Sequence, residues 1–137
     1  MRGFKPGAAR KEKGHERRRY SRFNIDLPVK YNRKANLSLK YGKYGRAVNA
    51  SEGGLLVHFP EETWIGQNLT LQLFFPLHSD LNILETSARV VWTSMHVRKD
   101  LAWDYRTGLS FVDLSPENRT QFKDYLMNFA QKAPSFS

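Results

Sequence analysis

Hydrophobic and polar residues alternate with a period of two over much of the chain after residue 22. The first such segment carries an apolar side chain at every second position: Phe23, Ile25, Leu27, Val29 and Tyr31. This alternation is typical of a strand with one face in the core and the other in solvent. Pro28 cannot donate a ladder hydrogen bond, so we expect this strand to lie at a sheet edge or to carry a bulge.

Further short strands are expected at residues 37–41, 44–48, 55–59, 69–75, 83–93 and 105–114. The first two of these form a hairpin that turns near Gly42. In the strand 83–93, alternation places Ala88, Val90 and Trp92 on one face. A polar loop, residues 96–104, precedes the last strand. Short strands at this spacing, with no helix between them, predict an antiparallel barrel or sandwich.

Only the end of the chain has a helical pattern. Ser115 is a suitable N-cap, Pro116 fits the first turn and Glu117 favours the positive end of a helix. A single apolar stripe follows, made of Phe122, Tyr125, Leu126 and Phe129. Its spacing is that of one helix face, so we expect the stripe to pack on the sheet and Pro134 to end the helix.

Composition limits the class of protein. A chain of 137 residues with 40% hydrophobic residues is long enough for one domain with a real core. The absence of cysteine excludes disulfides and cysteine-based zinc sites. No apolar run is longer than a strand, so we expect neither a signal sequence nor a membrane span, and a cytoplasmic location by default.

The net charge of +9 is concentrated at the N-terminus. Residues 1–22 contain nine Lys or Arg and only two Glu, and the remainder of the chain is nearly balanced. We expect a flexible basic arm at residues 1–15, a folded domain at 16–131 and a flexible tail at 132–137. Such an arm attracts anions, but charge alone does not distinguish nucleic acid, acidic membrane and a phosphorylated small molecule.

Signatures of catalysis are missing from the sequence. It has no phosphate-binding glycine loop, and Ser51 does not lie in a nucleophile elbow. The four histidines, His15, His58, His78 and His96, are scattered without the spacing of a metal motif. We therefore predict a protein that is not an enzyme and that has no metal site and no cofactor.

Two polar clusters remain. Four arginines, Arg17, Arg18, Arg19 and Arg22, lie just before the first strand, and guanidinium groups both grip phosphates and stack on planar rings. The second cluster begins 27 residues after Arg22. There Asn49 and Ser51, two apart, would face the same side of an extended segment, and Gly53 and Gly54 would let the backbone turn or approach a ligand closely.

These residues resemble the paired motifs of the PilZ domain family. Arg18-x-x-x-Arg22 followed by Asn49-x-Ser51-x-x-Gly54 is similar to its R-x-x-x-R and [D/N]-x-S-x-x-G motifs. The resemblance extends from about Glu16 to Phe129. It implies a mainly β fold, a six-stranded antiparallel barrel with a C-terminal α-helix, and it implies cyclic di-GMP as the ligand.

The resemblance also implies roles for individual residues. Arg18 and Arg22 would grip phosphates and guanine edges, with further contacts from Arg17 or Arg19. Asn49 and Ser51 would hydrogen-bond a guanine base, beside the turn that Gly53 and Gly54 allow. Trp92 is a weaker candidate for the site, because packing in the barrel would explain it equally well. The chemistry agrees, since arginine pairs with guanine O6 and N7 and stacks on its face.

Three interpretations stay open at this point. The first is a cyclic di-GMP receptor in which the ligand orders the arginine-rich segment and changes a surface that binds a protein partner. The second is a nucleic-acid-binding barrel that uses the basic arm and the hairpin Lys40–Arg46, where Tyr41 and Tyr44 could stack bases. The third is an adaptor that works through protein contacts alone; the complete Arg and Asn/Ser/Gly sets argue against it.

Overall fold

The computed structural model describes residues 21–33 and 42–132. The arginines Arg17, Arg18 and Arg19, the predicted arm 1–15 and strand 37–41 therefore lie outside the described residues, as do residues 133–137. The elements, in chain order, are β1 (Phe23–Asn32), β2 (Lys43–Ser51), β3 (Gly54–Phe59), β4 (Asn68–Leu77), β5 (Asp80–Val97), β6 (Trp103–Val112), α2 (Pro116–Phe129) and β7 (Gln131–Lys132).

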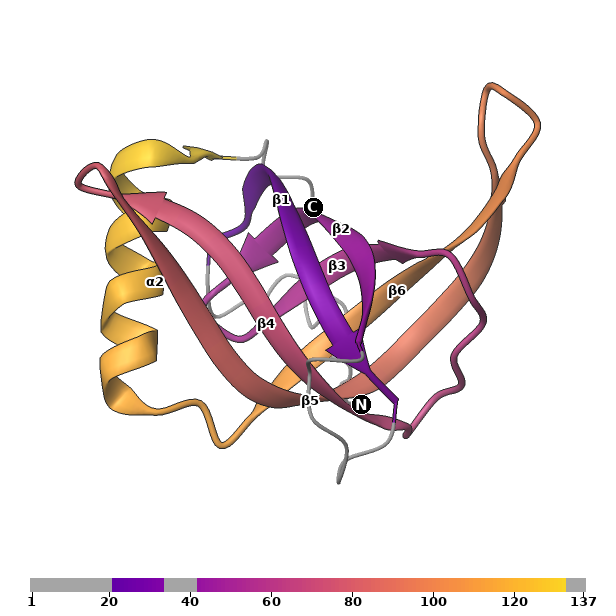
Figure 1. Ribbon diagram of the computed structural model, residues 1–137, viewed down its shortest axis with the longest axis horizontal. Coiled ribbons are helices and arrows are strands. Elements are labelled where there is room, and N and C mark those ends of the chain that lie inside the picture. Colours follow the sequence, from indigo (N-terminus) through magenta and orange to yellow (C-terminus); the bar gives the residue numbers. More distant parts are fainter. Residues whose placement is uncertain (1–20, 34–41, 133–137) are drawn as a thin grey trace, which may run out of the picture.

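Six strands form one closed antiparallel ring in the order β2-β3-β6-β5-β4-β1, and β1 pairs again with β2. Figure 1 shows the ring with α2 across one end. The core inside it is apolar: its largest fully buried side chains include Tyr31, Phe59, Phe75 and Phe122. The predicted fold class, a six-stranded antiparallel barrel with a C-terminal helix, is confirmed.

Strand β1 carries the irregularity that Pro28 predicted. Its register with β2 shifts between Asn24 and Leu27, and its ladder with β4 begins only at Val29, one residue after the proline. Pro28 itself lies beyond the bulge and pairs with Arg46 on β2, while on the other side β1 has no β4 partner at this position, so the proline interrupts no β1–β4 pair.

The predicted hairpin partner of residues 44–48, residues 37–41, lies outside the described residues, and the described partners of 44–48 are two other strands. Strand β2 pairs with β1, placing Tyr44 opposite Lys30, and with β3, placing Arg46 opposite His58. The basic segment around Tyr44 therefore belongs to the wall of the ring, where closure of the ring requires a partner on each side of β2.

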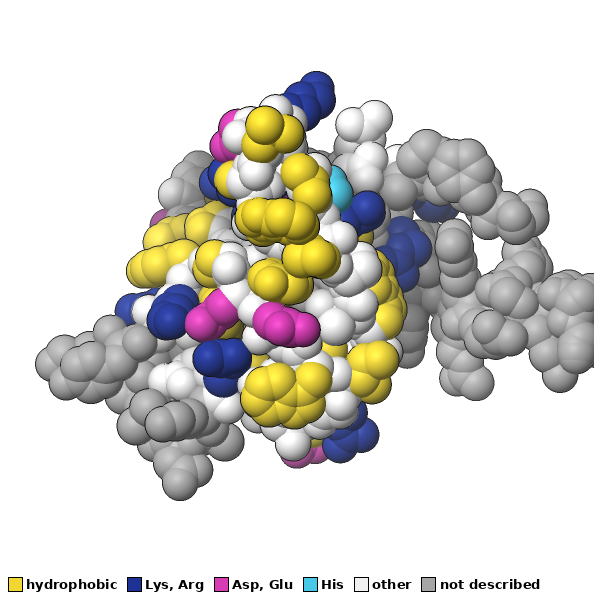
Figure 2. Space-filling model, turned by 90° about the vertical axis from the view of Figure 1, so that its right-hand side faces the viewer, with side chains coloured by type: hydrophobic (Ala, Val, Ile, Leu, Met, Phe, Trp, Pro, Cys, Tyr) yellow, Lys and Arg dark blue, Asp and Glu magenta, His cyan; other side chains and the backbone are white. Residues whose placement is uncertain are grey.

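Strand β5 is longer than the alternation predicted, and β6 begins at Trp103, two residues before its predicted start. Residues 93–97 continue β5 and pair with residues 103–107, so the expected loop 96–104 shrinks to a tip at residues 98–102. The resulting hairpin projects from the ring at the end away from α2 (Figure 1). Hydrophobic side chains run along it (Figure 2), and Met95, Val97, Leu101 and Trp103 are exposed.

Helix α2 begins as the sequence predicted, with the Ser115 hydroxyl accepting a hydrogen bond from the Asn118 backbone N–H at 3.1 Å. Phe122, Tyr125 and Leu126 are buried, but Phe129 is 55% exposed and lies beside Tyr125. The helix ends at Phe129, earlier than Pro134 suggested, because the next residues form β7. There Lys132, the first residue of the predicted tail, pairs with Phe23. None of the described helices is long and apolar enough to cross a membrane.

Candidate functional site

The two sequence motifs meet where β1 starts beside β2. Asn24 lies opposite Asn49 in the ladder, so Arg22, two residues earlier, reaches the same end of β2. The Arg22 Nε–H donates a hydrogen bond to Asn49 Oδ1 at 2.9 Å. Arg22 is exposed, and Asn49 is half-buried. A guanidinium group 27 positions away in sequence thus lies against the amide that the second motif supplies.

Ser51 lies at the end of β2, in the tight turn to β3. It is 8% exposed, and its hydroxyl oxygen accepts a hydrogen bond from the Gly53 backbone N–H at 3.2 Å. The Gly53 carbonyl in turn accepts from the Phe111 backbone N–H at 2.9 Å, which ties the turn to β6. A hydroxyl that accepts one hydrogen bond keeps its own proton to donate, so Ser51 holds the turn and can also serve as a donor.

The structure explains the glycine at position 54 differently from the sequence analysis. Its φ angle is not in the left-handed region, which among the described glycines only Gly66 occupies. Instead, a Cβ at Gly54 would overlap the carbonyl oxygen of Leu109 on β6. The motif glycine therefore permits close approach of β3 to β6, and it fixes the position of the turn that carries Ser51.

Trp92 lies on the outside of the ring. Strict alternation places it in the core with Val90, but the β5–β6 register shifts between Val90 and Trp92, and Trp92 is 41% exposed. A second shift, in β2 between Ala47 and Asn49, lies in the same part of the sheet. Each bulge adds a residue to one strand, which turns the following side chain to the opposite face.

The bulges align four residues across four strands. Asn49 pairs with Leu56, Leu56 with Gly108, and Gly108 with Trp92. Directly paired residues point to the same side of a sheet, so Asn49 and Trp92 share one outer face. Gly108 leaves room there for the indole, since a Cβ would lie 2.7 Å from Trp92 Cδ1. The row therefore presents the Asn49 amide at one end and the Trp92 ring at the other.

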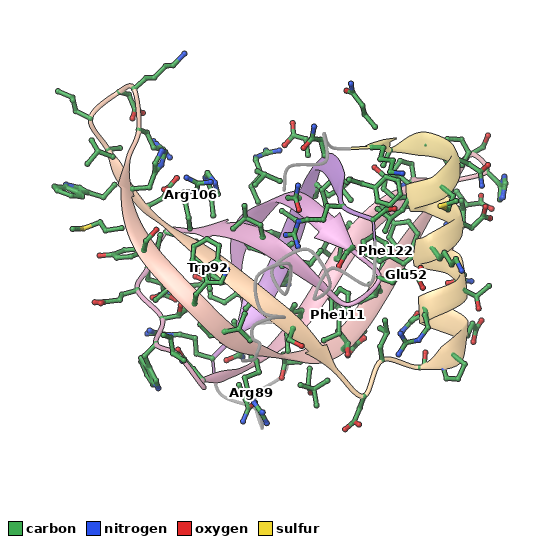
Figure 3. All side chains as sticks on the ribbon, turned by 180° about the vertical axis from the view of Figure 1, so that it is seen from behind. Glu52, Arg89, Trp92, Arg106, Phe111 and Phe122 are labelled. Atoms are coloured by element: carbon green, nitrogen blue, oxygen red, sulfur yellow. The ribbon has the colours of Figure 1, made fainter. Side chains whose placement is uncertain are left out.

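Two arginines that the sequence reasoning missed flank this row. Arg106 pairs with Ser94 and lies two residues before Gly108, whereas Arg89 pairs with Ser110, two residues after it. Both are exposed, and Figure 3 shows them on either side of Trp92. Ser110 also pairs with Gly54, so Arg89 shares a row with the motif turn. The period of two is the signal that could have placed them outside the core, within β5 for Arg89 and within β6 for Arg106.

The basic segment around Tyr44 is less suited to a polyanion than its composition suggested. Lys43 binds the Glu61 carboxylate at 3.0 Å, and Arg46 binds Asp26. The Lys30 ammonium lies 5.7 Å from the centre of the Tyr44 ring, over one of its faces. Lys40 and Tyr41 lie outside the described residues. The described cations of this segment therefore already have carboxylate partners.

Comparison with known proteins assigns the family. The sequence model of the PilZ domain family matches residues 16–128. The chain belongs to the PilZ domain family. No curated protein matches its sequence.

Solved PilZ structures share the fold at low sequence identity. The chain is similar to the PilZ domain with c-di-GMP of YcgR from Escherichia coli, with a TM-score of 0.59, 18% identity and coverage of 81% of this chain and 89% of that one. It is also similar to the Bacillus subtilis inhibitor of motility MotI/DgrA, with a TM-score of 0.64, 18% identity and coverage of 81% and 49%. The chain thus spans about half the length of MotI/DgrA, and likewise 48% of the K. pneumonia protein MrkH, at a TM-score of 0.62 and 11% identity.

Proposed function

We propose that this PilZ domain is a cyclic di-GMP receptor rather than an enzyme. The ligand carries two phosphates and two guanines, and it would bind on the outer face between the turn at Ser51 and the indole of Trp92. Two relatives of the same fold have c-di-GMP in their structures, YcgR of Escherichia coli and PlzA of Borreliella burgdorferi.

The observation that carries the proposal is the hydrogen bond between Arg22 and Asn49. It joins one residue of the arginine cluster, which by itself is compatible with any anion, to the outer face that carries the Asn49 amide and the Trp92 ring. The remaining cluster residues, Arg17, Arg18 and Arg19, lie three to five positions before Arg22 in the chain. They are therefore tethered within a few residues of the face that carries Asn49.

Each side chain has a chemical role in this proposal. Arg18 and Arg22 bind phosphate oxygens and the O6 and N7 atoms of guanine, which match the fork of a guanidinium group. Asn49 and Ser51 hydrogen-bond a guanine edge, and Gly53 and Gly54 set the turn that presents Ser51. Trp92 offers an apolar ring surface to a base, a contact worth about 1–3 kcal/mol in nucleic-acid complexes.

Binding would also order the chain. Residues 16–22 would close over the outer face, at an entropic cost that ligand contacts must offset. The change would alter the surface that a downstream protein partner recognises.

The direct test is calorimetric titration of the Arg18→Ala/Arg22→Ala variant with cyclic di-GMP. We expect binding to be lost while the thermal unfolding transition of the ring is kept, because Arg22 is exposed and both residues precede the first strand. The matched control is Lys99→Ala/Arg119→Ala, which removes two exposed cations from the hairpin tip and from α2. Unchanged affinity in the first variant, or equal loss in the control, would contradict the proposal.

A salt series separates this proposal from nucleic-acid binding. A single guanine-selective site saturates at a fixed stoichiometry and survives moderate salt. Binding through the basic arm would instead fall steeply with salt and would accept many oligonucleotides. Tight, salt-sensitive binding of oligonucleotides without saturable binding of cyclic di-GMP would replace the receptor assignment.

A further inference from the structure

Three side chains that are far apart in sequence converge beside the base of the β5–β6 hairpin: His58, His96 and Asp104. His58 comes from β3, His96 from β5 and Asp104 from β6. His96 lies opposite Asp104 in the β5–β6 ladder, and His58 lies opposite Arg106, two residues after Asp104, in the β3–β6 ladder. All three therefore face the same side of the sheet. His58 and His96 are far apart in the sequence, and their spacing gave no sign of this cluster, which only the pairing of the strands creates.

The carboxylate of Asp104 joins the two imidazoles. His96 Nδ1 lies 3.0 Å from Asp104 Oδ1, and His58 Nδ1 lies 3.2 Å from Asp104 Oδ2. One ligand atom from each of the three residues can be chosen so that all lie within 4.8 Å of one another. Asp104 is 5% exposed, which limits its motion, whereas both histidines are only partly buried and can turn.

We propose that His58, His96 and Asp104 form a binding site for a divalent transition-metal ion of the zinc class. Two imidazole nitrogens and one carboxylate oxygen are a donor set that suits Zn²⁺, Co²⁺ and Ni²⁺, whereas Mg²⁺ and Ca²⁺ prefer oxygen alone. Two ligands about 2.0–2.1 Å from a tetrahedral metal are about 3.3 Å apart. The two nitrogen–oxygen separations here are close to this value, but each is to a different oxygen of Asp104. Binding therefore requires one imidazole to turn toward the oxygen that the other contacts, or both carboxylate oxygens to bind the ion. Water would fill the remaining positions.

The surroundings leave room for an ion and its water. An open cavity of about 360 Å³ adjoins the cluster, and its lining includes His58, Asp104, Trp103 and two arginines. Those arginines, Arg46 and Arg98, would repel a cation if they were unpaired. Arg46 binds Asp26, however, and Arg98 binds Asp100 at 2.8 Å. The carboxylate of Asp104 therefore stays available to the histidines.

A bound ion would tie together three adjacent strands. His58 is one residue from the end of β3, and the other two ligands are on the two arms of the projecting hairpin. The ion would hold the base of that hairpin against the ring. The three ligands are distinct from the residues proposed to bind cyclic di-GMP, so either proposal can fail without the other.

The test is titration of the full, tag-free chain with Zn²⁺ by calorimetry and with Co²⁺ by visible absorption. The chain has no cysteine, so thiolates cannot supply a competing site. We expect one ion per chain and an increase in the unfolding temperature with Zn²⁺. His58→Asn and His96→Asn should each weaken binding at least about tenfold, the lower end of what even outer-shell changes cost metal sites.

The chain offers a matched control in His78. Its Nε2 lies 3.2 Å from Asp124 Oδ2, so it forms the same kind of pair with only one histidine. His78→Asn should leave Zn²⁺ affinity unchanged. Equal losses in all three variants, or no binding by the unaltered chain, would overturn the proposal.

A measurement on the unaltered protein covers the case in which the variants do not fold. Paramagnetic Co²⁺ should shift or broaden the imidazole proton resonances of His58 and His96 at one equivalent, and leave those of His78 in place. Perturbation of His78 to the same extent, or of none of the three, would exclude a specific site at Asp104.

Discussion

The indole of Trp92 covers Gly108, its partner across the β5–β6 ladder, so closely that a methyl group there would lie 2.7 Å from Cδ1. Gly108→Ala should therefore push the indole off the outer face and lower the free energy of unfolding by about 1–3 kcal/mol. In a Trp92→Ala background the same change should cost little. Urea denaturation of the unaltered protein, the two single variants and the double variant measures the coupling between positions 92 and 108. An equal cost in both backgrounds would mean that the backbone at Gly108, rather than the indole, demands the glycine.

Gly54→Ala should be more harmful, because the obstacle is backbone. A Cβ there meets the carbonyl oxygen of Leu109, which cannot rotate away without breaking the β3–β6 ladder. We expect a loss of about 2–3 kcal/mol in urea denaturation, the upper part of the usual range for overpacking. Gly108→Ala in the Trp92→Ala background serves as the control, since there the neighbouring side chain has been removed. A similar, small loss in both would contradict the close-approach explanation.

Asn49→Ala should weaken cyclic di-GMP binding about tenfold, equivalent to about 1.4 kcal/mol, because it removes both the partner of Arg22 and a base-facing amide. Asn49→Asp keeps the acceptor and should retain binding. Calorimetry compares the two. Asn128→Ala is the control and should leave the affinity unchanged, since Asn128 is exposed on α2, away from the row that carries Asn49. Equal affinities for the Ala and Asp variants at position 49 would mean that the acceptor oxygen does not contribute to binding.

Arg89 and Arg106 should each contribute to binding although neither belongs to a sequence motif. They flank the row from Asn49 to Trp92 on the outer face (Figure 3), where they would bind a phosphate group of the ligand. We expect Arg89→Ala and Arg106→Ala to weaken binding about fivefold each, the effect of an interaction worth about 1 kcal/mol. The loss should shrink at high salt. Arg119→Ala, on α2, should have no effect, and a loss there equal to the other two would point to net charge instead.

The ionised side chain of Glu61 should stabilise the folded state. Burial opposes its ionisation, but hydrogen bonds from Lys43 and Tyr31 outweigh this and hold its pKa below the ordinary value of 4.5. A carboxyl group with a lowered folded-state pKa stabilises the fold above its unfolded pKa, and the contribution is lost as the pH falls through the folded one. Glu61→Gln should therefore cost about 1 kcal/mol at pH 7 and progressively less below about pH 4.5.

Urea denaturation between pH 7 and pH 3 measures that difference. Glu62→Gln is the control, because the contact that Glu62 receives from Arg33 is to its backbone carbonyl and survives the change. If the cost of Glu61→Gln stayed constant with pH, the carboxylate would not be the stabilising form.

The sequence alone determined the fold class, because its information is local and repeated. Period-two alternation marks strands whatever their partners, and the cap at Ser115 marks a helix start from three adjacent residues. The PilZ resemblance likewise rests on short motifs with fixed internal spacing. The binding roles of Arg18, Arg22, Asn49 and Ser51 stay predictions for the titrations to test.

Tertiary structure decided what alternation could not. Whether Trp92 faces the core or solvent depends on a one-residue register shift between β5 and β6, and no residue of β5 marks this bulge as Pro28 marked the irregularity of β1. The partner of β2 depended on ring closure, and the length of the hairpin depended on pairing between its two arms. The meeting of His58, His96 and Asp104 depended on the order of β3, β6 and β5 in the ring. Each of these is a relation between strands, and the sequence of one strand does not specify its neighbour.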